Sequence, residues 1–179
     1  MSSDDAIDIM NVINLYALAV DTQQWDLFDR VFVEDVHADF GGAAKWQDLA
    51  SLKRDFAAIH SPFRATQHTT TNHQAVVSGD RANAISYVHG RFIRPVPAGG
   101  DMFESCGWYD DKLARTASGW RIVHRTCRTI WGGGNPRVLE TMPGVTVEQQ
   151  LHSLTGEAQL RSIAFLDALR PRQAHSTID

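Results

Sequence analysis

The sequence is poor in cysteine, in excess positive charge and in long apolar runs, and each shortage excludes a class of protein. Cys106 and Cys127 are its only cysteines, too few for a disulfide scaffold and without the ligand spacing of a zinc site. Seventeen Lys and Arg against 21 Asp and Glu give a net charge of −4, which argues against a nucleic-acid partner. The N-terminus is acidic, and no apolar run approaches the roughly 20 residues that cross a bilayer, so we expect no membrane association and a cytoplasmic protein.

Common nucleotide and hydrolase motifs are also missing. The chain has no G-x-G-x-x-G after a strand, no G-x-x-x-x-G-K-[ST] and no G-x-S-x-G. What it does have is 179 residues, 43% of them hydrophobic, which is enough for one domain with a real core.

The hydrophobic pattern changes from helical to strand-like near Arg64. The N-terminal part predicts a helix at 4–22, a short amphipathic piece at 25–32, a short strand at 36–40 and a second helix at 49–59. Four runs rich in Thr, Val, Tyr and Phe then follow, separated by turn residues, at 65–77, 81–94, 102–115 and 119–131. This order predicts an α+β fold, in which the helices pack on one face of a curved antiparallel sheet.

The stretch from Gly132 to Pro136 predicts a boundary. We therefore expect an α+β domain over 1–134 and a C-terminal tail over 135–179, with one helix at Glu157–Leu169. The tail could cap a pocket or embrace a neighbouring subunit. Apolar residues such as Tyr87 and Ile93 fall on the outer sheet face and need covering, which favours a homo-oligomer.

His68 is the histidine best placed for chemistry among the eight of the chain. It shares one face of its strand with Thr70 and Asn72, a polar row that suits a pocket. His73, five residues beyond His68, falls on the opposite face by the same alternation. This arrangement argues against a shared metal, and we expect no metal site.

Asp21 ends the first helix and lies off its apolar stripe. It is either a solvated aspartate or one held by a donor, because a carboxylate at a helix C-terminus meets the negative end of the macrodipole. If His68 is that donor, Asp21 would orient the ring and make His68 a general base.

Several short segments occur in an order that resembles a known family. They are the long helix ending at Asp21, Arg64-Ala65-Thr66-Gln67-His68 followed by Asn72, Ser78-Gly79-Asp80-Arg81, Gly107-Trp108-Tyr109-Asp110-Asp111, and Gly119-Trp120-Arg121-Ile122. Over residues 4–132 the sequence resembles the SnoaL-like branch of the nuclear transport factor 2-like superfamily, which implies a cone-shaped sheet packed against the N-terminal helices, as in a cystatin-like α+β barrel. Similar members are scytalone dehydratase, bile-acid dehydratase and hexachlorocyclohexane dehydrochlorinase, in which an Asp–His dyad removes a proton and a leaving group departs.

The resemblance implies roles for four residues. Asp21 and His68 match the dyad, Tyr16 matches an acidic or polarising tyrosine, and Arg125 resembles an arginine that assists the leaving group. Two positions depart from the family, because Gly90 stands where bile-acid dehydratase has an aspartate and Phe92 falls near a second histidine of scytalone dehydratase. The related dehydratases favour a trimer, and the wider superfamily a dimer.

If His68 faces a cavity, strand alternation predicts the rest of its lining. The aligned inward set is mainly apolar and aromatic and comprises Val88, Gly90, Phe92, Phe103, Ser105, Tyr109, Arg125, Cys127 and Thr129. His89 and Arg91 have the opposite parity, and Trp108 and Trp120 are assigned to packing.

Such a lining suits a small hydrophobic or aromatic hydroxylated substrate. We therefore expect a cofactor-independent lyase of the dehydratase type or an isomerase. The alternative is a non-catalytic ligand-binding or assembly module of the same fold.

Overall fold

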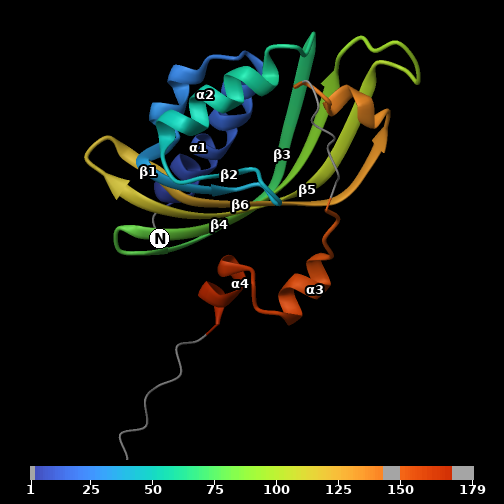
Figure 1. The fold of residues 1–179 in the computed structure, drawn as a ribbon. Coiled ribbons are helices and arrows are strands. Elements are labelled where there is room, and N and C mark those ends of the chain that lie inside the picture. The colour runs from blue at the N-terminus through green and yellow to red at the C-terminus, as the bar shows by residue number, and fades with distance from the viewer. Residues whose placement is uncertain (1–2, 143–149, 171–179) are drawn as a thin grey trace, which may run out of the picture.

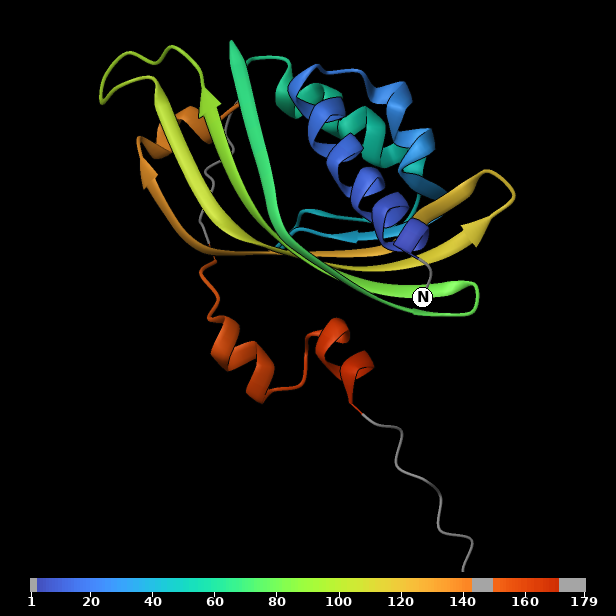
Figure 2. The ribbon, with the colours of Figure 1, turned by 180° about the vertical axis from the view of Figure 1, so that it is seen from behind.

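A single curved sheet carries helices on both of its faces in the computed structural model, which describes residues 3–142 and 150–170 (Figure 1). The helical elements are α1 (Ser3–Asp21), η1 (Trp25–Arg30), α2 (Leu49–His60), η2 (Pro136–Leu139), α3 (Leu154–Gln159) and α4 (Ala164–Leu169), of which η1 and η2 are 3₁₀ helices. The strands are β1 (Phe32–Asp39), β2 (Lys45–Trp46), β3 (Ala65–Ser78), β4 (Arg81–Ile93), β5 (Met102–Thr116) and β6 (Gly119–Gly134). Helices α1 and α2 fill the concave face of the sheet, and α3 and α4 lie beyond the opposite face, as both views show (Figures 1 and 2). The expected α+β class, with N-terminal helices packed on a curved sheet, is confirmed.

The two long N-terminal helices form where the apolar periodicity predicts them. Ile9, Ile13 and Tyr16 recur at helical spacing on α1, and all are buried. Helix α2 begins after Asp48, whose carboxylate accepts a hydrogen bond from the Ser51 backbone N–H at 2.7 Å. Together the helices cover the concave face with one apolar layer.

The strand order is β2-β1-β6-β5-β4-β3. Strands β3 to β6 form the expected antiparallel meander. Strand β1, which follows η1 directly, is the exception, because it pairs with β6 in parallel orientation. The sheet is therefore mixed rather than purely antiparallel.

An irregularity in β3 overturns one expectation about the histidines. Thr71 pairs with Tyr87 and Gln74 with Ile85, so two residues of β3 oppose the single Ser86 of β4. A bulge of this kind shifts the alternation of side chains. As a result His73 faces α1, on the same side of the sheet as His68, and Asn72, at φ 54°, is exposed. The predictions that His73 faces the opposite side and that Asn72 shares the His68 face are both wrong.

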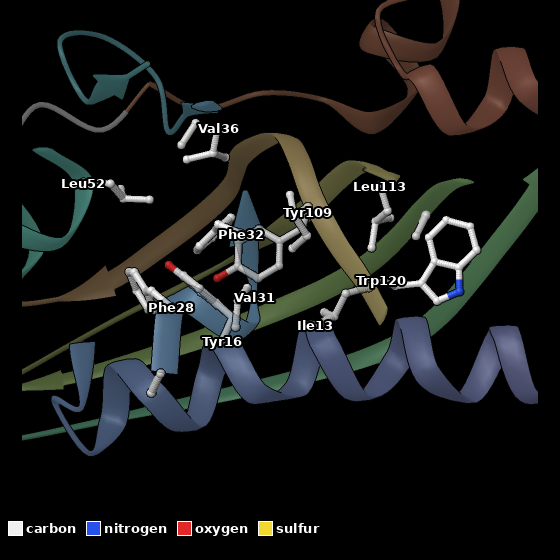
Figure 3. Close-up of a cluster of buried hydrophobic side chains, with 14 of the residues drawn as sticks. Ile13, Tyr16, Phe28, Val31, Phe32, Val36, Leu52, Tyr109, Leu113 and Trp120 are labelled. Carbon is white, nitrogen blue, oxygen red and sulfur yellow. The ribbon is translucent and has the colours of Figure 1, made fainter. Parts of the chain in front are cut away.

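Aromatic rings dominate the core between α1, α2 and the sheet. Tyr16 stacks on Phe28 at 5.5 Å between ring centroids and meets Tyr109 edge-on at 5.6 Å (Figure 3). Trp108 and Trp120 are buried, as their assignment to packing predicts. A second, smaller cluster lies at the far end of the sheet, where Phe103 packs with Phe63 and Val138.

The tail differs from expectation in two respects. The glycines at 132–134 belong to the end of β6 rather than to a boundary segment. In place of one helix at Glu157–Leu169 there are α3 and α4, separated at Arg161, which has a φ of 56° outside the helical region. Helix α4 packs against β3, β4 and β5, and the buried Asp110 carboxylate accepts hydrogen bonds from the backbone N–H groups of Ala164 (2.6 Å) and Phe165 (3.0 Å). The tail therefore covers part of the outer sheet face of its own chain.

Candidate active site

Asp21 and His68 meet where the C-terminal end of α1 crosses the beginning of β3. One Asp21 oxygen, Oδ1, lies 2.7 Å from His68 Nδ1 and accepts a hydrogen bond from the Thr66 hydroxyl at 2.9 Å. The other oxygen, Oδ2, accepts the His68 backbone N–H at 2.7 Å. Three donors from one strand therefore hold this carboxylate at the unfavourable end of the helix dipole.

The charge of Asp21 fixes the tautomer of His68. Burial acts to raise the pKa of Asp21, but the hydrogen bonds from the His68 ring, the His68 backbone and Thr66 outweigh it and lower the pKa overall. An ionised carboxylate can only accept hydrogen bonds, so the proton between the two side chains belongs to Nδ1 of the ring. Nε2 of His68 is then left with a free lone pair, as a general base requires.

His68 opens onto a cavity of about 260 Å³ between the helices and the sheet. Its other lining residues are predominantly apolar and aromatic and come from α1, the turn after β1, α2 and its following turn, three strands and η2: Tyr16, Phe40, Phe56, Ile59, His60, Phe63, Val88, Gly90, Phe92, Ser105, Cys106, Gly107, Tyr109, Cys127, Arg128, Thr129 and Leu139.

Most side chains expected around His68 lie at this cavity. Those that do are Tyr16, Val88, Phe92, Ser105, Tyr109, Cys127 and Thr129. Phe103 does not line it, because its ring is packed under η2 in the second core cluster, so its expected place in the pocket is wrong. His89 and Arg91 stay outside, where they contact Glu104 and Gln67.

Arg125 also lies outside the lining and is fully buried behind the two tyrosines. Its guanidinium donates two hydrogen bonds to the Asp111 carboxylate, at 2.8 Å and 2.7 Å, and stacks 4.3 Å from the Tyr16 ring and 4.0 Å from the Tyr109 ring. Burial acts to lower the pKa of Arg125, but Asp111 outweighs it and raises the pKa. Among the residues that the structure describes, Nη1 of Arg125 has no hydrogen-bond partner and is buried. Arg125 therefore cannot touch a molecule in the cavity without a rearrangement of the tyrosines, contrary to the expected direct contact.

Both tyrosines are neutral phenols at the edge of the cavity. Burial raises the pKa of Tyr16 and of Tyr109, while the Arg125 charge acts to lower each. Burial likewise raises the pKa of the Cys127 thiol, to about 12, so that this side chain is an uncharged lining group. Near neutral pH the cavity wall offers hydroxyl and thiol donors without negative charge.

Sequence reasoning missed three residues that shape the site. The only sequence feature that points to Asp111 is that a charged residue stands at an inward-facing position of its strand. His60 is buried beside the cavity, and burial lowers its pKa to about 4, so it is neutral. Leu139 reaches the cavity from η2, in a segment whose local pattern predicts only a tail.

Within residues 3–142 and 150–170, no group of three or more His, Cys, Asp or Glu side chains has an arrangement that could hold a metal ion. Over the same residues, no helix is both long and apolar enough to cross a membrane.

Comparisons with known proteins agree with this fold. An uncharacterized protein of Mycobacterium tuberculosis is 30% identical over 127 residues, which cover 68% of this chain and 82% of the relative. The crystal structure of the Kfla4162 protein from Kribbella flavida superposes with a TM-score of 0.74 at 25% identity, covering 78% of this chain and 99% of that one. A hexachlorocyclohexane dehydrochlorinase shares the fold with a TM-score of 0.64 at 18% identity, covering 80% and 96% of the two chains.

The SnoaL-like domain family matches residues 1–126. This span includes α1, η1 and α2, the first five strands and most of the residues around His68. The expected resemblance is thereby confirmed, and the chain belongs to the SnoaL-like domain family.

Proposed function

We propose that the protein is a cofactor-independent lyase of the dehydratase type, or an isomerase, that acts on a small apolar or aromatic hydroxylated substrate. The observation that carries the proposal is the Asp21–His68 pair at the wall of an apolar cavity. The shared fold of a hexachlorocyclohexane dehydrochlorinase, an elimination enzyme by name, supports this class of reaction.

His68 is the base of the proposed reaction. Nε2 takes a proton from a substrate carbon next to a carbonyl, and the electron pair of the broken C–H bond becomes the new C=C bond as the β-hydroxyl departs. The Asp21 carboxylate, 2.7 Å from Nδ1, stabilises the imidazolium that forms. The departing hydroxide receives the proton from His68 and leaves as water, which restores the resting dyad.

Tyr16 and Arg125 stabilise the negative charge that develops on the carbonyl oxygen. The neutral Tyr16 phenol lines the cavity and can donate a hydrogen bond to that oxygen. Arg125, 4.3 Å behind the Tyr16 ring, adds a positive charge in a medium of low dielectric. General acid–base groups contribute roughly 10²–10⁴-fold each, so orientation in the cavity supplies much of the remaining acceleration.

The cavity limits the size of the substrate. An engineered apolar cavity of about 150 Å³ holds benzene. The 260 Å³ here therefore fits one ring with substituents, and its aromatic lining favours a largely apolar one.

A panel of small cyclic β-hydroxy ketones tests the proposal. Elimination forms a conjugated enone, which is followed by ultraviolet absorbance. We expect turnover of at least one member, with a loss of about 10²-fold or more in His68→Gln. His89→Gln is the matched control, because His89 lies on the outer face and contacts Glu104. Equal rates in the wild type and His68→Gln would contradict the assigned base.

We further propose that residues 1–134 form the functional domain, with Leu139 of η2 completing the cavity wall, and that the outer sheet face mediates self-association. Tyr87 is 43% exposed on this face. Trp131 is 44% exposed, and its ring centroid lies 5.9 Å from that of His89. Light scattering should give a homo-oligomer for the wild type and a smaller mass for Tyr87→Lys. A monomeric wild type would contradict this assignment.

A further inference from the structure

Gly90 lies in the interior of β4, where a glycine weakens a strand. Its backbone gives no reason for a glycine, because Gly90 does not adopt the positive φ of turn glycines such as Gly79 and Gly119. The missing side chain is therefore the property that needs a reason.

A β-carbon at position 90 would enter the candidate active site. It would lie 3.1 Å from two ring atoms of Phe92 and 3.3 Å from Nε2 of His68, both closer than ordinary van der Waals contacts. Gly107 on the next strand is different, since its β-carbon would lie 1.9 Å from the Arg128 carbonyl oxygen and is excluded by backbone. At Gly90 the three nearest atoms all belong to side chains of the cavity.

The Phe92 ring packs against the His68 ring. The two rings meet edge-on, with centroids 5.5 Å apart and planes at 87°. Phe92 also packs on Phe63, at 5.4 Å between ring centroids. The position of a β-carbon at residue 90 therefore lies beside both the Phe92 ring and Nε2 of His68.

We infer that Gly90 is a specificity-determining position, whose missing side chain leaves open the path by which a substrate carbon reaches Nε2 of His68. This inference rests on the proposed function of His68 as a base. Because the nearest atoms are carbons of the Phe92 ring and Nε2 itself, the part of the substrate received there is an apolar, hydrogen-bearing carbon rather than a charged or hydrogen-bonding group. Substrates with a branched carbon at the reacting position are rejected.

The experiment measures the accessibility of Nε2 without a substrate. Diethyl pyrocarbonate, which acylates neutral imidazole nitrogens, is added to the full-length protein, and the labelling rate of His68 is followed by peptide mass spectrometry. We expect Gly90→Ala to lower that rate about tenfold, as overpacking of one methyl group would. Gly133→Ala is the control, because a β-carbon there would find its nearest atom at 3.9 Å in Trp131, and it should leave the rate unchanged.

A double variant separates this role from simple accommodation of the Phe92 ring. Gly90→Ala with Phe92→Ala removes the 3.1 Å contact but keeps a methyl group 3.3 Å from Nε2. We expect labelling to remain slower than in Phe92→Ala alone. The double variant also serves if Gly90→Ala alone does not fold.

Two outcomes of the labelling experiment overturn the inference. One is labelling of His68 in Gly90→Ala at the wild-type rate, and the other is equal rates in the double variant and Phe92→Ala. Turnover that needs His68 but tolerates Gly90→Ala would likewise reject the role of Gly90 and leave the proposed function intact. Turnover that is insensitive to His68 would instead reject the proposed function, while the labelling rates still decide whether Gly90 controls access.

Discussion

Replacement of Asp21 by asparagine should reverse the tautomer of His68. An amide has one accepting oxygen and one donating nitrogen, whereas the Asp21 carboxylate accepts on both sides. If the amide oxygen keeps the His68 backbone N–H, the amide nitrogen faces Nδ1 and donates to it. Nε2 then carries the proton, and the lone pair needed in the cavity is lost.

The size of the effect follows from the three hydrogen bonds that Asp21 accepts. Bonds to a charged group contribute roughly 1.5–3 kcal/mol each, and the amide keeps or reverses rather than deletes them. With the Asp21 side chain 21% exposed, we expect Asp21→Asn to lower the free energy of unfolding by about 2 kcal/mol at pH 7. Any turnover that uses His68 should fall by about 10⁴, the cost of a wrong tautomer in a comparable dyad.

The pH dependence has a defined sign. The pKa of Asp21 is lower in the folded protein, so the unfolded chain binds more protons as the pH falls through about 4. The stabilisation is complete above that pH and is lost below it as the pH falls through the folded pKa. The difference between the wild type and Asp21→Asn should therefore shrink in acid.

Nitrogen-15 NMR of the His68 ring and urea unfolding at pH 7 and below pH 4 measure both effects. Thr66→Val is the control, because it removes a single hydrogen bond at 2.9 Å and leaves the carboxylate charged. An unchanged Nδ1–H tautomer in Asp21→Asn would show that the Asp21 carboxylate does not fix the tautomer of His68.

Three further perturbations have defined outcomes. Arg125→Met leaves Asp111 buried without a partner and should cost about 3–5 kcal/mol in urea unfolding, and adding Asp111→Leu should recover most of that loss. Burial lowers the pKa of His60 to about 4, so between pH 4 and 6.5 this side chain binds fewer protons in the folded than in the unfolded protein. His60→Phe should therefore flatten the fall in the free energy of unfolding on acidification across that window. An unchanged slope would contradict this. Asp110→Ala removes the acceptor at the start of α4 and should speed amide hydrogen exchange at 164–169 without changing the His68 NMR signals.

Local patterns account for most of the fold. Helix α1, helix α2 and the meander from β3 to β6 follow from apolar periodicity and turn residues, each of which acts over a few positions. The parallel β1–β6 pair does not, because it joins Phe32 to Ile122 across most of the chain and leaves no local trace. The bulge near Asn72 likewise depends on how β3 must bend over α1.

The site could be predicted where strand alternation is regular. Val88 and Tyr109 lie at the cavity for that reason. Alternation alone cannot tell a cavity wall from packed core, so it misplaced Phe103, which η2 covers. Alternation also predicted the correct face of the sheet for Arg125, but not that its side chain is buried behind the cavity wall. Asp111, which holds Arg125 there, is identified as its partner only by the three-dimensional contact.

Proton exchange at a substrate carbon is the most direct test of whether His68 acts as a base. A cyclic β-hydroxy ketone is incubated with the protein in D₂O, and deuterium at the carbon next to the carbonyl is followed by NMR. If Nε2 of His68 removes that proton, the wild type incorporates deuterium or releases the enone, and His68→Gln does neither above the uncatalysed rate. Exchange in His68→Gln at the wild-type rate would contradict the account.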